Sequence, residues 1–384
     1  MYDGQGAAVK TRRPSFVEVD LGAIASNTRA IRQMIGDDRL LMAVVKADAY
    51  GHGVIPVSER VLANGADWLG VALPQEALAL REAGVSAPIL VLGYSDPDAY
   101  RLLIEAGVRM TVYSFAQGEA MALAAREEGA RATVHYKIDT GMGRIGFLPG
   151  DEALKEIKAL AGKSELVSEG CFTHFARADD EDDTSWRGQM RVFDEFLSRL
   201  AGEGVAFSMT HCANTAAGLR DPSSIMSMYR TGIGVYGIYP SENTRAWSSI
   251  ELTPALSWKS VLSHVKWIKK GDGVSYGHIW RAAKDTLVGT VPVGYADGYR
   301  RELENKGYIL VKGKRAPVIG RICMDMFMVD LSGAPQAKAG DEVILLGRQG
   351  DEEISADSLA DMTGTISYEI ICSIGHRIPR HYVG

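Results

Sequence analysis

The chain has 384 residues, more than one hydrophobic core usually supports, so its length favours two domains of unequal size. Hydrophobic residues make up 46% and charged residues 23%, an ordinary globular composition that excludes extended disorder. A net charge of -6 gives no electrostatic footprint for nucleic acid. No apolar stretch approaches the roughly 18 residues of a membrane span, so we expect neither nucleic acid nor membrane as a partner.

The cysteines and the N-terminal residues indicate the cellular compartment of the protein. The four cysteines are widely separated, with no CxxC pair and no clustered disulfide framework, so we expect buried, reduced thiols. Residues 1–15 lack the apolar segment of a secretory signal. We therefore expect a cytoplasmic protein, and we expect no metal site.

Up to about residue 238, short β-rich runs alternate with segments whose apolar residues have helical spacing. This alternation is typical of βα units repeated around a parallel sheet, and eight units favour a closed (β/α)8 barrel over an open sheet. The candidate strands lie at residues 40–47, 67–72, 88–93, 109–114, 133–138, 169–175, 208–214 and 228–237. One earlier strand, at residues 16–21, is left over, and we expect it to pair outside the barrel.

The pattern changes after the turn-rich stretch at residues 239–249. Strand-like runs then follow one another between Gly and Pro turns, without long helices between them. These runs lie at residues 255–277, 285–294, 307–320, 326–333 and 341–347. The sequence therefore predicts an α/β protein with a TIM-type barrel at residues 14–249 and a smaller, mainly antiparallel β-domain at residues 250–384.

Lys46 ends an apolar, β-branched strand and is followed by the polar loop ADAYGHG. A lysine at a strand end commonly extends into solvent. The functional interpretation is a Schiff-base lysine, because a partly desolvated amine forms imines readily. At the C-terminal mouth of a barrel strand, Lys46 would lie where barrel enzymes place their chemistry.

Four further segments, rich in polar residues or in glycine, lie at or just after the ends of predicted strands and therefore converge on the same face of the barrel as Lys46. These segments are HYKIDTGMGRIGF from His135, FTHFA around His174, HCANTAA from His211 and YRTGIGVYG from Tyr229. One such loop is commonly a simple turn. Five of them at one barrel mouth favour a functional site.

With these motifs in view, the chain resembles the alanine racemase family, whose members are pyridoxal-phosphate enzymes with a barrel and a β-domain. The resemblance runs from FVEVDL at residue 16 to SYEIICSIGHRIPR, which ends at residue 380. The KADAYGHG segment is highly specific, and the second domain adds GVSYGHIW, VGYADGYRR, GRICMDMFMVD and ISYE. The resemblance implies an isomerase that interconverts L-alanine and D-alanine and supplies D-alanine for peptidoglycan.

The resemblance also implies a two-base mechanism. Lys46 would bind the cofactor aldehyde and exchange the α-proton on one face of the substrate. Tyr276 would be the base on the opposite face, because a planar carbanion must be reprotonated from the side that did not lose its proton. Tyr276, Tyr295 and Met324 would enter the neighbouring subunit's site, so the resemblance implies a homodimer with shared active sites.

The same resemblance assigns the cofactor contacts. The phosphate would be held by Tyr50, Thr215, Gly232, Ile233 and Tyr368. Family members often carry serine where Thr215 stands, but the hydroxyl is retained. Arg230 would face the pyridine nitrogen, and His211 would orient Arg230. His174 would pack against the cofactor ring, and Asn214 would complete this part of the site.

The remaining implied residues serve the substrate. Arg144 would contact the phenolic oxygen of the cofactor and the substrate carboxylate, and Lys137 would be carbamylated so that it holds Arg144. The backbone N–H of Met324 would bind the substrate carboxylate, with Asp325 supporting it. The entrance corridor would be lined by Asp179, Tyr295, Arg301 and Arg321.

Three alternatives remain at the level of sequence. A broad-specificity, serine or lysine racemase would keep the chemistry and change the substrate. An ornithine or diaminopimelate type decarboxylase would require a glycine triplet and a CxxxD motif, but Cys323 is followed here by MDM. A pyridoxal-phosphate carrier would end after the barrel.

Overall fold

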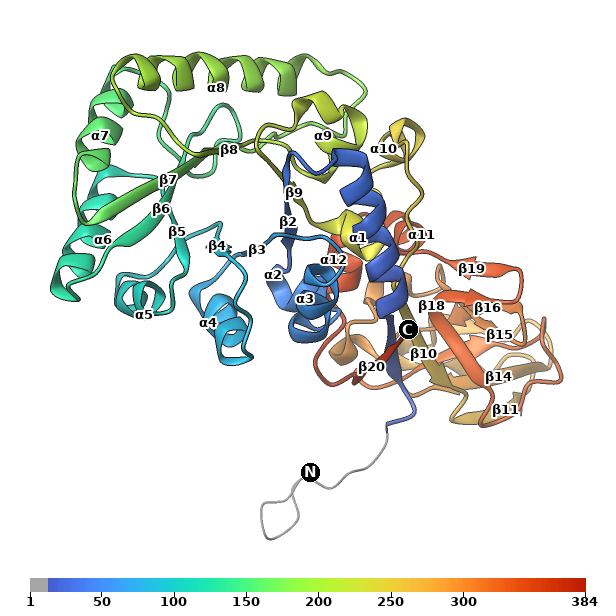
Figure 1. Ribbon diagram of the computed structural model, residues 1–384. Helices are drawn as coiled ribbons and strands as arrows, with labels where there is room; N and C mark the ends of the chain where they lie inside the picture. The colour runs from blue at the N-terminus through green and yellow to red at the C-terminus, as the bar shows by residue number, and fades with distance from the viewer. Residues whose placement is uncertain (1–12) are drawn as a thin grey trace, which may run out of the picture. The chain divides into compact units, whose positions relative to one another are not determined.

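The computed structural model describes residues 13–384. Residues 1–12, most of the segment in which the sequence predicts no secretory signal, lie outside the described residues. The described chain forms two compact units, one of Leu21–Pro254 and one that joins the residues up to Asp20 with Ala255–Gly384 (Figure 1). No helix within residues 13–384 is long and apolar enough to cross a membrane.

The Leu21–Pro254 unit is built around eight parallel strands. In sheet order β8-β7-β6-β5-β4-β3-β2-β9, all the pairs are parallel. The strands are β2 (Leu40–Val44), β3 (Trp68–Val71), β4 (Ile89–Val91), β5 (Arg109–Val112), β6 (Ala132–Lys137), β7 (Leu166–Phe172), β8 (Met209–His211) and β9 (Met228–Thr231). Between the two outermost strands, the Ser227 N–H donates to the Thr210 carbonyl at 3.1 Å. The predicted (β/α)8 barrel is therefore confirmed, in nearly closed form.

Helices follow the strands and cover the outside of the barrel, as Figure 1 shows for α4 to α8. They are α1 (Leu21–Ile35), α3 (Val54–Leu62), α4 (Pro74–Glu82), α5 (Tyr100–Glu105), α6 (Phe115–Glu127), α7 (Asp151–Ala161), α8 (Thr184–Gly202), α9 (Thr215–Arg220) and α10 (Glu242–Trp247). The interior contains a cluster of buried side chains from four strands, made of Met42, Trp68, Leu90 and Met228. This cluster fills part of the barrel interior with packed side chains.

The second unit is a mainly antiparallel sheet of order β11-β14-β17-β16-β15-β18-β10-β1-β20, with β19 paired to β18. Its elements are β1 (Phe16–Asp20), β10 (Leu256–Val261), β11 (His264–Ile268), β12 (Gly273–Val274), β13 (Trp280–Arg281), β14 (Thr286–Val291), β15 (Tyr308–Val311), β16 (Lys314–Ile319), β17 (Phe327–Asp330), β18 (Glu342–Gln349), β19 (Glu352–Ile354), α11 (Ala356–Thr363), α12 (Ser367–Cys372) and β20 (Arg380–Val383). The left-over strand β1 pairs antiparallel with β10 and parallel with β20. It thus belongs to the β unit, although it lies inside the range 14–249 predicted for the barrel.

The burial of the four cysteines differs in part from the expectation. Cys171 and Cys212 are buried, as predicted, and burial raises the pKa of the Cys171 thiol. Cys372 is exposed and Cys323 is partly exposed, so the prediction of burial was wrong for these two. Cys372 ends the short helix α12, and Cys323 lies in a loop before β17, positions that the β-domain core does not cover.

Gly237 provides a test of the packing in the Leu21–Pro254 unit. Its φ is +82°, and a Cβ there would lie 1.8 Å from the Thr253 carbonyl oxygen. We expect Gly237→Ala to lower the free energy of unfolding by about 2 kcal/mol or more. Urea unfolding would measure this loss. Gly188→Ala is the matched control, because Gly188 lies inside α8 with nothing within 4 Å of an added Cβ, so it should be neutral or stabilising. Equal effects of the two changes would contradict this account.

Candidate active site

Lys46 follows β2 and opens a left-handed turn of the backbone. The four residues after it have φ values of 54°, 54°, 53° and 53° for Ala47, Asp48, Ala49 and Tyr50. The Ala49 N–H donates to the Val45 carbonyl at 2.9 Å. Because left-handed helical geometry costs L-residues about 1–2 kcal/mol each, surrounding contacts must hold this turn in place.

Glu76, the third residue of α4, supplies one of these contacts. Its Oε1 accepts the Ala47 N–H at 2.6 Å, and its Oε2 accepts the N–H groups of Ala72 and Leu73 at 2.8 and 3.1 Å. One carboxylate therefore ties the end of β3 to the turn that presents Lys46. Glu76 was not identified from the sequence, although a glutamate at the third position of a helix is typical of a capping residue.

Four cations converge on His174, which follows β7. Burial lowers the pKa of His174 well below its usual value, and the charges of Arg230, Arg144, Lys137 and Lys46 lower it further, in that order. The structure thus brings together five of the predicted residues at the C-terminal mouth of the barrel. Their combined charge favours an anionic ligand, because like charges held close together in a poorly solvated site require a counter-charge.

Arg230 lies at this mouth with only 4% of its surface exposed. Its Nη2 donates to the carbonyls of Thr173 and Cys212 at 2.9 and 3.0 Å, and its Nη1 donates to His211 Nδ1 at 2.8 Å. Nη2 also lies 3.3 Å from His174 Nδ1. Burial lowers the pKa of Arg230 to about 10, so the guanidinium remains charged at neutral pH. These hydrogen bonds therefore fix the orientation of the Arg230 guanidinium.

Lys137 ends β6 and is buried, with its Nζ donating to the Ile138 carbonyl at 2.9 Å. Burial lowers the pKa of Lys137 to about 7, and the charges of Arg230 and Arg144 act in the same direction. Near neutral pH a large share of this amine is therefore uncharged. An uncharged buried amine is a nucleophile, whereas an ordinary surface lysine is almost wholly protonated.

The loop that carries Arg144 is built around Asp139. This carboxylate accepts N–H groups of Gly141, Met142 and Gly143 on Oδ1 and the Arg144 N–H on Oδ2, at 2.9 to 3.0 Å. Burial acts to raise the pKa of Asp139, but these backbone hydrogen bonds outweigh burial and lower it. Asp139 was not identified from the sequence, although an aspartate before TGMG is a typical turn-forming residue.

Tyr50, Thr215 and Gly232 form a group of donors beside the mouth. A Cβ on Gly232 would lie 2.4 Å from Tyr50 Oη, and the Gly232 N–H donates to Thr215 Oγ1 at 2.9 Å. Asn214 caps α9 through its side chain, which accepts the Ala217 N–H, and Ile233 begins the short helix after Gly232. Hydroxyl groups and helix N-termini thus gather where the glycine leaves room, an arrangement suited to an anion.

In the β unit, four predicted residues lie on three adjoining loops: Tyr276, Tyr295, and Arg321 with Met324. Ser275 Oγ, next to Tyr276, donates to the Arg321 carbonyl at 2.6 Å, and the Tyr295 N–H donates to the Cys323 carbonyl at 3.1 Å. The side chains on these loops are unusually open, with 70% of Tyr276, 43% of Tyr295 and 52% of Met324 exposed. The β unit thus presents a cluster of exposed aromatic and apolar side chains.

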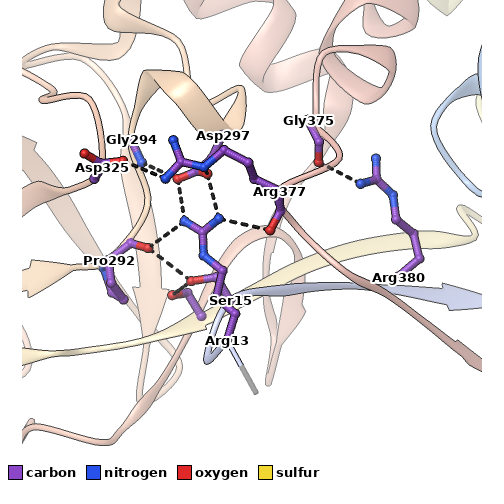
Figure 2. Close-up of polar contacts among 10 residues, drawn as sticks. Arg13, Ser15, Pro292, Gly294, Asp297, Asp325, Gly375, Arg377 and Arg380 are labelled. Atoms are coloured by element: carbon purple, nitrogen blue, oxygen red, sulfur yellow. Dashed lines mark hydrogen bonds and ion pairs between the residues drawn. The ribbon is translucent and has the colours of Figure 1, made fainter. Parts of the chain in front are cut away.

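An ion-pair network centred on Asp297 fixes these loops (Figure 2). Asp297 is fully buried, and both of its oxygens accept hydrogen bonds from Arg13 at 2.7 Å. Asp297 Oδ2 also accepts the Gly294 N–H at 3.1 Å. Arg377 lies 3.4 Å from Asp297 and donates to Asp325 at 2.6 Å. Asp325 is therefore connected to Asp297 through Arg377.

The close approach of Gly294 explains how the network reaches Met324. A Cβ on Gly294 would lie 2.3 Å from the carbonyl oxygens of both Cys323 and Met324. Asp297 accepts the Gly294 N–H, and the Ala296 N–H, two residues further on, donates to the Met324 carbonyl at 3.0 Å. Arg13, which no sequence motif indicated, is therefore part of the support for this loop.

Three predicted residues lie on separate elements. The carbonyl of Asp179, a half-buried residue, accepts Ser241 Oγ at 3.2 Å. Arg301 is exposed and pairs with Glu304 at 2.9 Å. Tyr368 is half-buried in α12. The proposed roles of Asp179 and Arg301 in an entrance corridor and of Tyr368 in phosphate binding stay predictions.

Comparisons with known proteins agree with this geometry. Models of the alanine racemase N-terminal and C-terminal domains match residues 19–240 and 255–382. An alanine racemase of Desulforamulus reducens is 44% identical over 373 residues, which cover 97% of this chain and 100% of that protein. An alanine racemase of Symbiobacterium thermophilum is 43% identical, with 97% and 98% covered.

Solved structures give the same picture. Alanine racemase from Bacillus anthracis, solved with bound L-Ala-P, has a TM-score of 0.93 and 40% identity, covering 98% of this chain and 96% of that one. A histidine racemase from Leuconostoc mesenteroides has a TM-score of 0.87 and 30% identity, with 97% and 99% covered. The fold, the site and these matches define an isomerase of the amino-acid racemase class. Within that class, the chain belongs to the alanine racemase family.

The Asp297 network makes a quantitative prediction. We expect Arg13→Ala to lower the free energy of unfolding by about 2 kcal/mol, because a buried carboxylate loses its two-point partner. Hydrogen exchange at the Tyr295 amide should accelerate, since this amide reports opening of the loop. Arg315→Ala is the control, because its pair with Glu352 is exposed and contributes under about 1 kcal/mol. Similar losses in both variants, with unchanged exchange at Tyr295, would show that Arg13 does not support the loop.

Proposed function

We propose that the chain interconverts L-alanine and D-alanine with pyridoxal 5'-phosphate as cofactor, and that it supplies D-alanine for peptidoglycan. The observation that carries this proposal is the group of arginine and lysine side chains around His174, which includes Arg230 at 3.3 Å and Lys46 after a barrel strand. A phosphate and a carboxylate provide the negative charge that this group requires. The acidic, ordinary globular composition supports a cytoplasmic location for this activity.

The donor set of the barrel suits this cofactor. Lys46 offers an amine for the aldehyde, and the space beside Gly232, which a Cβ would fill, is bordered by the Tyr50 hydroxyl. The Thr215 hydroxyl and the Ile233 N–H would add donors for the phosphate, and Asn214 supports them by capping α9, where its side chain accepts the Ala217 N–H. When bound, the cofactor supplies an electron sink that makes the α-proton of an amino acid acidic. Tyr368 is a further proposed phosphate ligand.

The residues of the chain then move protons and position the substrate. We assign Lys46 Nζ and Tyr276 Oη as the bases on opposite faces, because inversion requires removal of a proton on one side and its return on the other. Arg144 and the Met324 N–H bind the substrate carboxylate. Arg230 would face the pyridine nitrogen as a permanent donor, and because a guanidinium does not give up its proton in proteins it would leave that nitrogen unprotonated. Met324, Tyr295 and Tyr276 act in the site of a second copy of this chain.

We further propose a carbamate on Lys137. The neutral amine attacks carbon dioxide, a C–N bond forms, and the amine proton passes to solvent, which leaves an anion near Arg144 and Arg230. Burial and these two cations support the step, because they lower the pKa of Lys137 to about 7 and so supply the free amine. The anion would also relieve the repulsion among the cations.

A second substrate range has specific support. The histidine racemase neighbour shares the fold at 30% identity over nearly the full length, so this architecture accommodates a larger side chain in that protein. A broad-specificity, serine or lysine racemase therefore remains the alternative. The decisive comparison is the specificity constant for alanine against those for serine, lysine and histidine.

The test of the proposed function uses purified protein with added cofactor. L-Alanine should yield D-alanine, with serine, lysine and histidine assayed in parallel. Lys46→Ala and Tyr276→Phe should each lower racemisation by about 10²–10⁴. Mixing the two variants should restore about a quarter of the activity if subunits exchange, because half the dimers are mixed and each has one intact site. Inactive mixtures, despite proven exchange, would show that both bases come from one chain.

The carbamate is tested with ¹³C-labelled bicarbonate and ¹³C NMR. At pH 8 we expect a carbamate signal in the wild-type protein and none in Lys137→Met. Below about pH 6 the free amine is protonated, so a protein freshly exposed to label at that pH should not form the signal. Lys163→Met is the control and should keep the signal. A signal that survives Lys137→Met would refute the assignment.

A further inference from the structure

A line of hydrogen bonds crosses the barrel interior from Arg230 to the far ends of the strands. Arg230 Nη1 lies 2.8 Å from His211 Nδ1, and His211 Nε2 lies 2.9 Å from His135 Nδ1. His135 Nε2 then lies 3.1 Å from Glu169 Oε2. We call these four residues the Glu169 relay. Arg109, at the start of β5, pairs with the same carboxylate at 3.1 Å.

The chemistry of arginine fixes the direction of every bond in the relay. Arg230 can only donate, so His211 Nδ1 must accept. A neutral His211 then carries its proton on Nε2 and donates to His135 Nδ1. His135 in turn carries its proton on Nε2 and donates to the Glu169 carboxylate, which can only accept. With any other tautomer of either ring, two N–H donors or two acceptors would face each other at one of these contacts.

Both imidazole rings are buried and packed, so neither can rotate toward solvent to find another hydrogen-bond partner. His135 and His211 have no exposed surface, so a ring nitrogen without a protein partner could not form a hydrogen bond with water instead. His211 stacks on Phe172 with ring centroids 4.8 Å apart. A Cβ on Gly170 would lie 2.4 Å from His135 Nδ1, so the strand leaves room for the ring only because residue 170 is glycine.

Charge agrees with neutral rings. Burial lowers the pKa of His211 well below its usual value, and the Arg230 charge lowers it further. Burial also lowers the pKa of His135, although Glu169 acts in the opposite direction. For Glu169, burial acts to raise the pKa, but hydrogen bonds from His135 and Arg109 outweigh burial and lower it. The relay therefore runs from a carboxylate through two neutral imidazoles to a guanidinium.

We propose that Glu169 is a positioning residue for the reaction, acting through the tautomers of His135 and His211 on the orientation of Arg230. The inference rests on the proposed function, in which Arg230 faces the cofactor. Glu169 contacts neither cofactor nor substrate in this account. Without the Glu169 carboxylate, His135 can carry its proton on Nδ1 instead of Nε2. His211 would then lose the acceptor for its Nε2 proton. The hydrogen bond that directs Arg230 Nη1 would no longer be enforced.

The test compares Glu169→Met, Glu169→Gln and Arg109→Gln in the holoenzyme labelled with ¹⁵N-histidine. Ring ¹⁵N spectra should show His135 and His211 as the Nε2-protonated tautomer in the wild type. Glu169→Met has no carboxylate to accept the His135 Nε2 proton. In this variant we expect a mixture of tautomers for the two rings and a fall in kcat of about 10- to 100-fold at similar KM. Glu169→Gln retains a carbonyl acceptor and should recover the tautomers and most of kcat.

Arg109→Gln separates the relay from the ion pair at its end. It removes the partner of Glu169 but keeps the bond from His135, so tautomers and kcat should change less than about threefold. If Arg109→Gln and Glu169→Met lower kcat equally, or if Glu169→Met leaves both rings unchanged, Glu169 is not a positioning residue. Thermal unfolding of each variant checks that the fold is retained.

The two readouts also separate this inference from the proposed function. The ring spectra do not depend on any reaction, so tautomers that respond to Glu169→Met in a protein that fails to racemise alanine would support the relay and refute the function. If the protein racemises alanine but the tautomers of His135 and His211 do not change in Glu169→Met, the proposed function would be supported and the relay refuted.

Discussion

A buried cation sets the main constraint on the barrel. Arg230 has almost no exposed surface, and an isolated charge in that position would carry a desolvation cost of several kcal/mol or more. The carbonyl groups of Thr173 and Cys212, which follow β7 and β8, take the place of water around its guanidinium. These strand ends must keep their positions for Arg230 to remain there, so the charge and the barrel geometry depend on each other.

The same reasoning extends to the whole mouth of the barrel. Lys46 and Arg144 add positive charge, whereas the carboxylate of Asp139 is occupied by backbone N–H groups. Asp139 therefore builds a loop and does not neutralise the cations at the mouth. Such fixed charges need no reorganisation when an anion binds, which is the usual basis of electrostatic catalysis.

The sequence predicted the architecture because the alternation of strands and helices is a local signal. All eight barrel strands lie within the predicted runs or overlap them, and the chemistry-bearing residues at strand ends, such as Lys46 and Arg230, follow from that pattern. The supporting residues could not be predicted in this way. Glu76, His135 and Asp297 act through contacts with segments distant in sequence, and no local pattern indicates those contacts.

The left-handed turn after Lys46 has a consequence for stereochemistry. Its φ values near +54° are the mirror image of an ordinary helix, a geometry that D-residues adopt without strain. Ala47 and Ala49 have the smallest chiral side chain, and Asp48 belongs to the residue types that tolerate this region, so the chain limits the cost by its choice of residues. In a semisynthetic protein with D-alanine at positions 47 and 49, the backbone after Lys46 would be relieved of that strain.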